Sequence, residues 1–239
     1  WNADSFYAGA KWQALFTSII KAAWGVAPVL LIYKDATHKA ALEKELATLG
    51  YKAAEISKNV IFWQQETDSI WTRDYGPLGV VEGTGGAAAK LSFVDYRYYH
   101  TRVRDDETPT KLAAAWGVNV FRPDLDSEGG NFMNTTDGLC ALSKGVLWYN
   151  LGLSQSAIEK LFKEYQGCKE VLVVDAMAGA IPHIDMYAKF SADDTVLVGE
   201  YTAAQHASNK KILDAVAALL AKTKNPSGKT LKVIRIPMG

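Results

Sequence analysis

The chain repeats one order of segments along most of its length: a strand-like hairpin, a helix-like segment and a further strand-like segment. The unit recurs at intervals of roughly 50–60 residues, without obvious sequence identity between one copy and the next. Repeats of this size, each a small sheet with a helix, are typical of units arranged around an axis. We therefore predict an α/β fold built from such units.

Apolar periodicity and turn residues define the expected elements. Helices are expected at 5–24, 36–49, 106–116, 154–165 and 203–222. Strands are expected at 28–33, near 52–56 and 60–63, at 78–83 and 87–96 as a hairpin around 84–86, and at 118–123, 130–133, 139–144, 146–150, 171–175, 187–190, 195–201 and 231–237.

A doubly wound parallel sheet is the competing prediction for a chain that alternates strands and helices. The first expected strand, V-A-P-V-L-L-I-Y, is not followed by the glycine-rich loop that binds phosphates in many such sheets. The many hairpins also disfavour a sheet in which all strands run parallel.

Composition narrows the function classes. The chain has 239 residues, enough for one large domain or two small ones, and 49% of them are hydrophobic. Its 26 Lys and Arg residues balance 26 Asp and Glu residues, whereas a nucleic-acid binder normally carries a basic excess. No apolar run approaches the length of a membrane span. We expect neither a nucleic-acid partner nor a membrane partner.

Three features together favour export. The chain begins at Trp1, which predicts processing or trimming at the N-terminus. Cys140 and Cys168 are too few for a disulfide scaffold, but they could form one bridge in a secreted protein. Asn134-Thr135-Thr136 matches a glycan acceptor site. The prediction is an extracellular protein with a glycan site at Asn134, and the cysteine pairing stays open.

Three loops concentrate the residues that could carry chemistry: W-T-R-D-Y-G-P at 71–77, D-S-E-G-G-N-F-M at 126–133 and I-P-H-I-D-M-Y at 181–187. In the third loop, His183 and Asp185 lie two residues apart, so on an extended backbone both side chains face the same side. An imidazole can move a proton near neutral pH, and a carboxylate can hold a cation. A surface histidine beside a solvated aspartate is the alternative interpretation.

In the first loop, Asp74 follows Arg73 and precedes a Gly-Pro turn. One interpretation is a surface turn stabilised by local pairing of charges. The other is that Asp74 points into a cleft, where a carboxylate is the natural partner of a planar guanidinium. Trp71 would then supply an apolar or stacking wall.

The second loop opens with paired glycines at 129–130, which permit a close backbone approach or a tight bend before a hairpin. A functional role for Glu128 or Asn131 beside them is a weaker hypothesis. The four histidines show no metal-binding spacing, and no serine-nucleophile motif is present, so we predict no metal and no serine triad. Cys140 lies in an apolar strand and is interpreted as structural.

The motifs W-T-R-D-Y-G-P, E-G-G-N-F-M and H-I-D, in this order, resemble those of the Porphyromonas-type peptidylarginine deiminase family, which is related to agmatine deiminases. The resemblance begins at about residue 60 and continues to the end of the sequence. It implies the pentein α/β propeller, in which five ββαβ units surround a pseudo-fivefold axis with the active site in the middle. Residues 1–239 would form the N-terminal, larger part of one catalytic domain, about four of the five repeats.

The resemblance also implies a reaction: hydrolysis of the guanidinium of peptidyl-arginine to citrulline and ammonia. A cysteine thiolate attacks the guanidinium carbon, ammonia leaves, and water releases the product from a thiouronium intermediate. By motif match, Asp74 and Asp185 hold the guanidinium, and His183 is the general acid and base. No cofactor is implied.

Substrate choice within the family depends on Arg102 and Arg104, which resemble an Arg-x-Arg pair that receives a substrate C-terminal carboxylate. A charged loop tip is the alternative interpretation of this pair. Ala180 stands where a tyrosine is expected, so contact with the substrate backbone is expected to differ. The other substrate-contacting residues that the resemblance implies are Trp71, Ile181 and Asn131.

The chain departs from the family at the nucleophile. The family's catalytic cysteine lies near the C-terminus, well after H-x-D, and neither Cys140 nor Cys168 matches its position. We therefore expect a second polypeptide from the same precursor to carry that cysteine and the last repeat. The alternatives are an agmatine deiminase, or a non-catalytic, degenerate deiminase that binds arginine-containing peptides.

Overall fold

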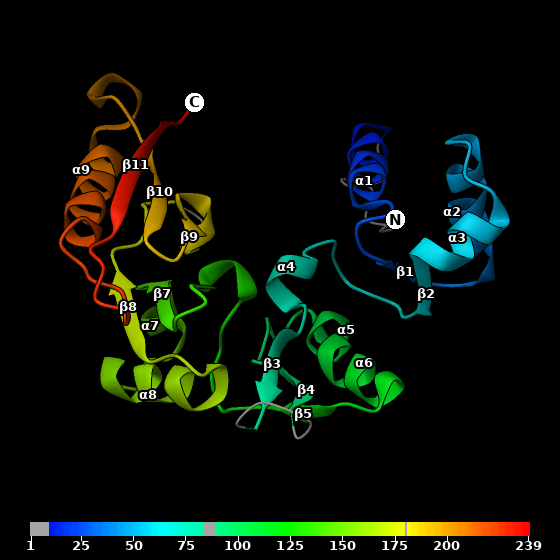
Figure 1. Cartoon of the computed structure of the whole chain (residues 1–239), viewed down its shortest axis with the longest axis horizontal. Helices are drawn as coiled ribbons and strands as arrows, with labels where there is room; N and C mark the ends of the chain where they lie inside the picture. Colours follow the sequence, from blue (N-terminus) through cyan, green and yellow to red (C-terminus); the bar gives the residue numbers. More distant parts are fainter. Residues whose placement is uncertain (1–9, 84–88, 180) are drawn as a thin grey trace. The chain divides into compact units, whose positions relative to one another are not determined.

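The computed structural model describes residues 10–83, 89–179 and 181–239. The turn expected at 84–86, Ala180 and the first residues of the expected helix at 5–24 lie outside the described residues. Two compact units make up the chain: Trp1–Thr72 with Thr101–Thr108, and Arg73–His100 with Pro109–Gly239. Figure 1 traces their elements in sequence colours.

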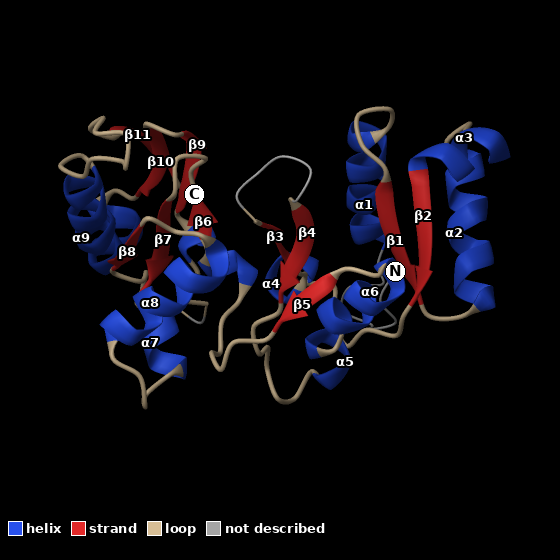
Figure 2. Ribbon diagram, turned by 60° about the horizontal axis from the view of Figure 1, so that its bottom comes forward, coloured by secondary structure: helices blue, strands red, loops and turns tan. Residues whose placement is uncertain are grey.

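The first unit contains a two-stranded parallel sheet and helices (Figure 2). Strand β1 (Val29–Tyr33) pairs in parallel with β2 (Val60–Gln64). Buried Ile20, Leu46, Ile56 and Val60 form its core. The helices of this unit are α1 (Ala10–Ala23), α2 (Ala36–Thr48), α3 (Ala53–Asn59) and α5 (Val103–Asp106).

Residues 52–56 were expected as a strand, and this prediction is wrong because they begin helix α3. The Glu55 carboxylate accepts a hydrogen bond of 2.8 Å from the Lys52 backbone N–H, which satisfies a donor at the start of the helix. Ile56 is the buried residue of this helix. A single buried face suits a short helix, whereas a strand would bury alternate residues.

The second unit contains three sheets of the same topology. In each sheet an antiparallel hairpin precedes a helix, and a final strand then pairs in parallel with the second strand of the hairpin. The strands are β3 (Leu78–Glu82), β4 (Lys90–Val94), β5 (Asn119–Phe121), β6 (Met133–Asn134), β7 (Leu139–Ser143), β8 (Glu170–Val174), β9 (Ala188–Ala192), β10 (Thr195–Glu200) and β11 (Lys232–Pro237). The intervening helices are α6 (Thr108–Trp116), α8 (Gln155–Gln166) and α9 (Ala203–Leu220).

These sheets confirm the predicted α/β class and the hairpin–helix–strand unit. A doubly wound parallel sheet is excluded for the described strands, because each of the three sheets contains an antiparallel pair. The parallel pairing in each unit follows from the helix between the two strands, since a parallel connection needs a long crossover.

Two further segments differ from the sequence-based expectation. Residues 146–150, expected as a strand, mostly form α7 (Gly145–Tyr149), and the Asn150 side chain closes the turn with a hydrogen bond of 2.7 Å to the Val146 carbonyl. Residues 130–133 were also expected as a strand, but 130–131 belong to the 3-10 turn η2 (Gly129–Asn131), and strand β6 is limited to Met133–Asn134. In both cases tertiary contacts override local strand propensity.

Helix α8 packs on strand β8, and helix α9 packs on strands β10 and β11, so each helix covers the sheet of its own ββαβ repeat (Figure 1). The Ser154 side chain caps α8 by accepting a hydrogen bond of 3.2 Å from the Ala157 N–H. Buried Phe162 of α8 stacks on Phe132, with ring centroids 5.5 Å apart. No helix in the described ranges is long and apolar enough to cross a membrane.

Cys140 and Cys168 form a disulfide bond between strand β7 and the segment that follows α8. Both residues are buried in the core around Phe162. The bond closes a loop with a sequence separation of 28 residues. In the chain-entropy model, a loop of this size corresponds to a stabilisation of about 3.5 kcal/mol.

This disulfide predicts that reduction destabilises the protein. We expect dithiothreitol to lower the free energy of unfolding by about 2–4 kcal/mol, because the reduced chain regains loop entropy when it unfolds. Urea titration followed by circular dichroism measures this change. The Cys140→Ser, Cys168→Ser double variant is the control, and its unfolding midpoint should not respond to dithiothreitol. Equal midpoints for the oxidised and reduced wild-type protein would contradict the prediction.

Candidate active site

Three short helical turns carry the three motifs, and each directly precedes the first strand of a ββαβ unit. Turn α4 (Thr72–Tyr75) leads into β3, η2 leads into β6, and η3 (Ile184–Met186) leads into β9. Asp74 lies on α4, Asp185 lies on η3, and His183 caps η3. The repeated topology therefore presents the three motifs from equivalent positions of three units.

The paired glycines at 129–130 allow these turns to meet. A Cβ atom on Gly129 would lie 2.1 Å from the Arg73 carbonyl oxygen. A Cβ atom on Gly130 would lie 2.5 Å from both Asp74 Oδ1 and His183 Nδ1, and 3.1 Å from Asp185 Oδ2. Any side chain at either position would clash, so three polar side chains converge over bare backbone.

His183 lies between two carboxylates. Its Nε2 is 2.9 Å from Glu128 Oε2, and its Nδ1 is 3.5 Å from Asp74 Oδ1. The His183 and Glu128 side chains are only 6% and 5% exposed. Because both ring nitrogens face carboxylates, the arrangement favours the imidazolium form, which can donate from both nitrogens.

The electrostatics of the cluster follow from burial and from these neighbours. Burial lowers the pKa of His183, but the hydrogen bond and charge of Glu128, with the charges of Asp74 and Asp185, raise it above the usual value. Burial raises the pKa of Asp74, and the neighbouring His183 lowers it in part. Burial likewise raises the pKa of Asp185 against the effect of His183. The cluster therefore binds protons more readily than isolated side chains would.

Arg73 turns toward Asp185. Its Nε lies 4.0 Å from Asp185 Oδ2, and its Nη2 donates a hydrogen bond of 2.8 Å to the Phe132 carbonyl. The Asp185 side chain is 31% exposed, the most open of the three acids in the cluster. A cationic ligand therefore has access to Asp185.

Asn131 fastens the second and third motifs together. Its Oδ1 accepts hydrogen bonds from the backbone N–H groups of Ser143, at 2.9 Å, and of Ile184, at 3.1 Å. Its Nδ2 donates to the Ser143 carbonyl, and the residue is 1% exposed. These bonds give Asn131 a positioning role, and the substrate contact expected for it stays a prediction.

Sequence reasoning did not assign the partners of His183. Glu128 was a weak hypothesis, and its only signal was its place directly before the two glycines. No sequence pattern pointed to Tyr99, although its hydroxyl forms a hydrogen bond with Glu128. Burial, followed by this bond and the Glu128 charge, raises the pKa of Tyr99, so its hydroxyl stays protonated.

Four further residues were predicted to contact the substrate: Trp71, Arg102, Arg104 and Ile181. Ile181 is described in the second unit and is 45% exposed. Trp71, Arg102 and Arg104 belong to the first unit, and their roles at the site stay predictions. No group of metal-ligating side chains able to hold an ion occurs in the described ranges.

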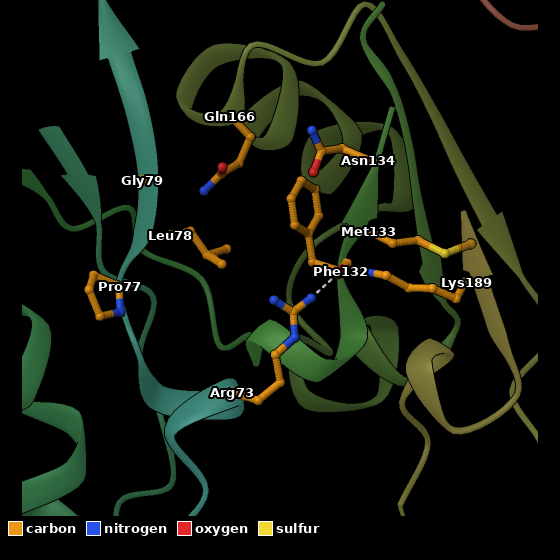
Figure 3. A pocket seen from close by; sticks show the side chains of 9 residues that line it. All are labelled: Arg73, Pro77, Leu78, Gly79, Phe132, Met133, Asn134, Gln166 and Lys189. Carbon is orange, nitrogen blue, oxygen red and sulfur yellow. Dashed lines mark hydrogen bonds between the residues drawn. The ribbon is translucent and has the colours of Figure 1, made fainter. Parts of the chain in front are cut away.

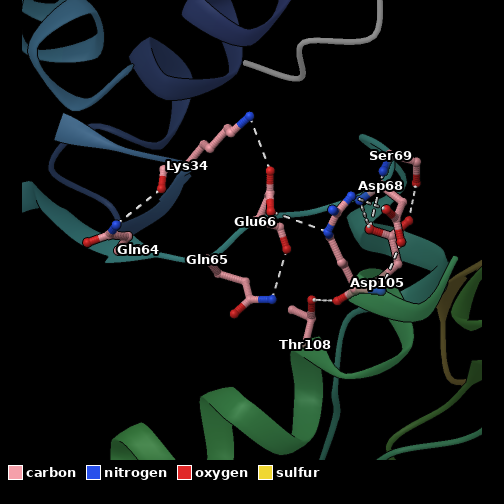
Figure 4. Close-up of polar contacts among 9 residues, drawn as sticks. Lys34, Gln64, Gln65, Glu66, Asp68, Ser69, Asp105 and Thr108 are labelled. Atoms are coloured by element: carbon pink, nitrogen blue, oxygen red, sulfur yellow. Dashed lines mark hydrogen bonds and ion pairs between the residues drawn. The ribbon is translucent and has the colours of Figure 1, made fainter. Parts of the chain in front are cut away.

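Arg104 is held by two acidic neighbours of the first unit, Glu66 and Asp68, which are labelled in Figure 4. Its Nη1 lies 3.0 Å from Asp68 Oδ1, and its Nε lies 3.3 Å from Glu66 Oε2. The buried carboxylate of Asp105 accepts hydrogen bonds from the N–H groups of Asp68 and Ser69 and from the Ser69 hydroxyl. The segment that leads into the first motif is therefore fastened to α5.

The Glu128 contact predicts a lower pKa for His183 in the Glu128→Gln variant, because the amide loses the charge that favours the imidazolium. Titration of the His183 ring by two-dimensional NMR measures this shift. Glu164→Gln, an exposed change on α8, is the matched control and should leave the His183 titration unchanged. An unchanged or higher His183 pKa in Glu128→Gln would contradict the assigned contact.

The same contact fixes the sign of a pH effect on stability. Because the pKa of His183 is raised in the folded state, its contribution is fully present below the unfolded value of 6.5. That contribution is lost as the pH rises through the folded pKa. We expect urea titrations between these two values to show a decline in unfolding free energy that is absent from Glu128→Gln. An identical pH dependence for the two proteins would argue against the linkage.

Comparison with known proteins assigns the chain to a family. The family model for Porphyromonas-type peptidyl-arginine deiminase matches residues 2–239. The agmatine deiminase of Stutzerimonas stutzeri is 24% identical over 246 residues, which are 95% of this chain and 62% of that protein. The chain spans about half to two thirds of the length of the curated relatives that it matches.

Solved structures show the same fold. The agmatine deiminase of Enterococcus faecalis superposes with a TM-score of 0.79 at 21% identity, over 96% of this chain and 63% of that one. The C. jejuni agmatine deiminase gives a TM-score of 0.72 at 21% identity, over 98% of this chain and 66% of that one. These likenesses support the α/β pentein fold. Because the model of that family matches residues 2–239, the chain belongs to the Porphyromonas-type peptidyl-arginine deiminase family.

Proposed function

We propose that this chain is the guanidinium-holding part of a deiminase that hydrolyses a guanidino group. The observation that carries the proposal is the convergence of Asp74, Glu128 and Asp185 on His183 above the Gly130 backbone. Three carboxylates carry more negative charge than the single imidazolium balances, so this half-buried site favours a further positive charge. A planar guanidinium is the cation that paired carboxylates bind best.

In the proposed reaction, Asp74 and Asp185 orient the guanidinium for attack by a cysteine thiolate. A C–S bond forms, and the C–N bond breaks as His183 gives its proton to the departing nitrogen, which leaves as ammonia. Water then attacks the thiouronium carbon and gives a proton to His183. The C–S bond breaks, which releases the urea-type product and the thiolate. The raised pKa of His183 supports a protonated acid for the first step.

The proposed thiolate comes from outside these 239 residues. Cys140 and Cys168 are bonded to each other, so neither offers a free thiol. We propose that a second polypeptide from the same precursor, or a further segment of a longer chain, brings the cysteine. That segment would also supply the fifth unit of a propeller in which this chain forms about four repeats. Without such a segment, the alternative is a non-catalytic protein that binds arginine-containing peptides.

Agmatine is the substrate that we favour over peptidyl-arginine. The similar proteins described above are named agmatine deiminases, and agmatine carries no carboxylate. Peptidyl-arginine would rely on Arg102 and Arg104 to receive a C-terminal carboxylate. The ion pairs of Arg104 with Asp68 and Glu66 weaken that role. Peptidyl-arginine stays the second candidate because the family model carries its name.

We further propose that the protein is exported. The Cys140–Cys168 disulfide supports this proposal, because such bonds persist mainly in oxidising compartments.

The proposal predicts that the chain binds agmatine through Asp74 and Asp185. We expect Asp74→Asn and Asp185→Asn each to weaken agmatine binding roughly tenfold or more, because each removes a charge-assisted contact to the guanidinium. Isothermal titration calorimetry measures the affinity. Putrescine, which lacks the guanidinium, should bind more weakly than agmatine, and a peptide ending in arginine tests the second candidate.

Glu164→Gln serves as the control for the loss of an exposed carboxylate and should bind agmatine like the wild type. Thermal melts of each variant separate lost binding from lost folding. Equal affinities for agmatine and putrescine would sink the guanidinium assignment. Tighter binding of the arginine peptide than of agmatine would replace agmatine with peptidyl-arginine.

The origin of the thiolate has its own test. Protein isolated from its native host should contain a cysteine-bearing segment beyond these residues, which denaturing mass spectrometry detects as a longer chain or a second chain. That preparation should release ammonia from agmatine. A host-derived protein of this sequence alone that binds agmatine without releasing ammonia would instead favour the non-catalytic binder.

A further inference from the structure

A pocket of about 300 Å³ lies in the second unit (Figure 3), and it shares Arg73 with the surroundings of the carboxylate cluster. Two of its lining side chains are cationic and two are amides, and no Asp or Glu is among the described residues that line it. The lining residues are Arg73, Pro77, Leu78, Gly79, Phe132, Met133, Asn134, Gln166 and Lys189.

The polar groups of the pocket approach it from different elements. Figure 3 shows the Arg73 guanidinium on one side and the amides of Asn134 and Gln166 on the other. One hydrogen bond, from Nη2 to the Phe132 carbonyl, holds the guanidinium and leaves other N–H groups for a ligand. The Arg73 side chain is 51% exposed, so these groups are accessible.

Gln166 contributes a buried donor. Its Nε2 forms at most a weak hydrogen bond, to the Tyr96 hydroxyl, which leaves one of its two N–H groups without an acceptor in the described part of the chain. Buried amide N–H groups are normally paired. An acceptor atom of a ligand in the pocket would accept a hydrogen bond from this N–H group.

Asp185 is the acidic group that must be weighed against an anion here. Its Oδ2 lies 4.0 Å from Arg73 Nε, on the side of the guanidinium that faces the carboxylate cluster. Lys189 also acts on Asp185 electrostatically, at a distance beyond an ion pair. Arg73 and Lys189 carry two positive charges, and the partly exposed carboxylate of Asp185 balances only one of them. Positive charge therefore remains available to the pocket.

We propose that this pocket binds a small organic carboxylate, with Arg73 and Lys189 as the cationic pair and Asn134 and Gln166 as amide partners. The forked N–H groups of an arginine match the two oxygens of a carboxylate. Pro77, Leu78 and Phe132 supply apolar walls that suit a short carbon chain.

Arg73 links this pocket to the carboxylate cluster, because one guanidinium faces both. A carboxylate in the pocket would offset the Arg73 charge and leave Asp185 more strongly negative toward a ligand cation. The two ligands would then strengthen each other's binding by the same factor. This coupling, unlike the carboxylate site itself, rests on the proposed function.

Glutarate is the probe for the site, measured by calorimetry at low ionic strength, where charge interactions are least screened. We expect Lys189→Gln to weaken glutarate binding roughly tenfold, and the uncharged analogue glutaramide to bind at least as weakly. Lys160→Gln removes an exposed lysine of α8 outside the pocket and should bind glutarate like the wild type. Inorganic phosphate tests whether any oxyanion suffices.

Equal losses in Lys189→Gln and Lys160→Gln, or equal binding of glutarate and glutaramide, would overturn the site. NMR spectra of the Asn134 and Gln166 side-chain amides give an independent readout, and they should shift with glutarate. Phosphate binding as tight as glutarate would overturn the organic-carboxylate class. Agmatine affinity measured with and without glutarate tests the coupling: no change would remove the coupling but leave the carboxylate site.

Discussion

The contact between the imidazole of His183 and the carboxylate of Glu128 holds the candidate site together. Both side chains are buried, and an unpaired charge on either would cost several kcal/mol. Asp74 approaches the other ring nitrogen, so the imidazole compensates two acids at once. The position of the guanidinium-binding carboxylates in our proposal depends on this one charged ring.

Backbone geometry makes the contact reachable. The three motifs occupy turns that each precede the first strand of a ββαβ unit, so the repeated topology brings them to one place. The final approach depends on Gly129, which leaves space for the Arg73 carbonyl, and on Gly130, which leaves space for the Asp74 and His183 side chains. Asn131 then ties η2 to η3 through backbone hydrogen bonds. A repeating scaffold thus supports a site that is itself asymmetric.

Long, strongly patterned segments could be predicted from the sequence. The helices expected at 203–222 and 154–165 lie close to the observed bounds of α9 and α8. Short segments failed: 52–56 and 146–150 have strand-like composition, but packing of Ile56 and Val146 makes them helical. A few apolar residues cannot separate helix from strand, because the choice depends on which surface they meet.

For the candidate site, the sequence alone showed that three separate loops carry a carboxylate, two glycines and an H-x-D pair. The expectation that His183 and Asp185 face one side of an extended backbone does not hold, because Ile184–Met186 form the 3-10 turn η3. Tertiary structure decided the pairings: Glu128 meets His183, Arg73 faces Asp185, and Cys140 is bonded to Cys168. Sequence patterns report periods of a few residues, whereas these contacts join residues tens of positions apart. Only the packing of whole units sets such distances.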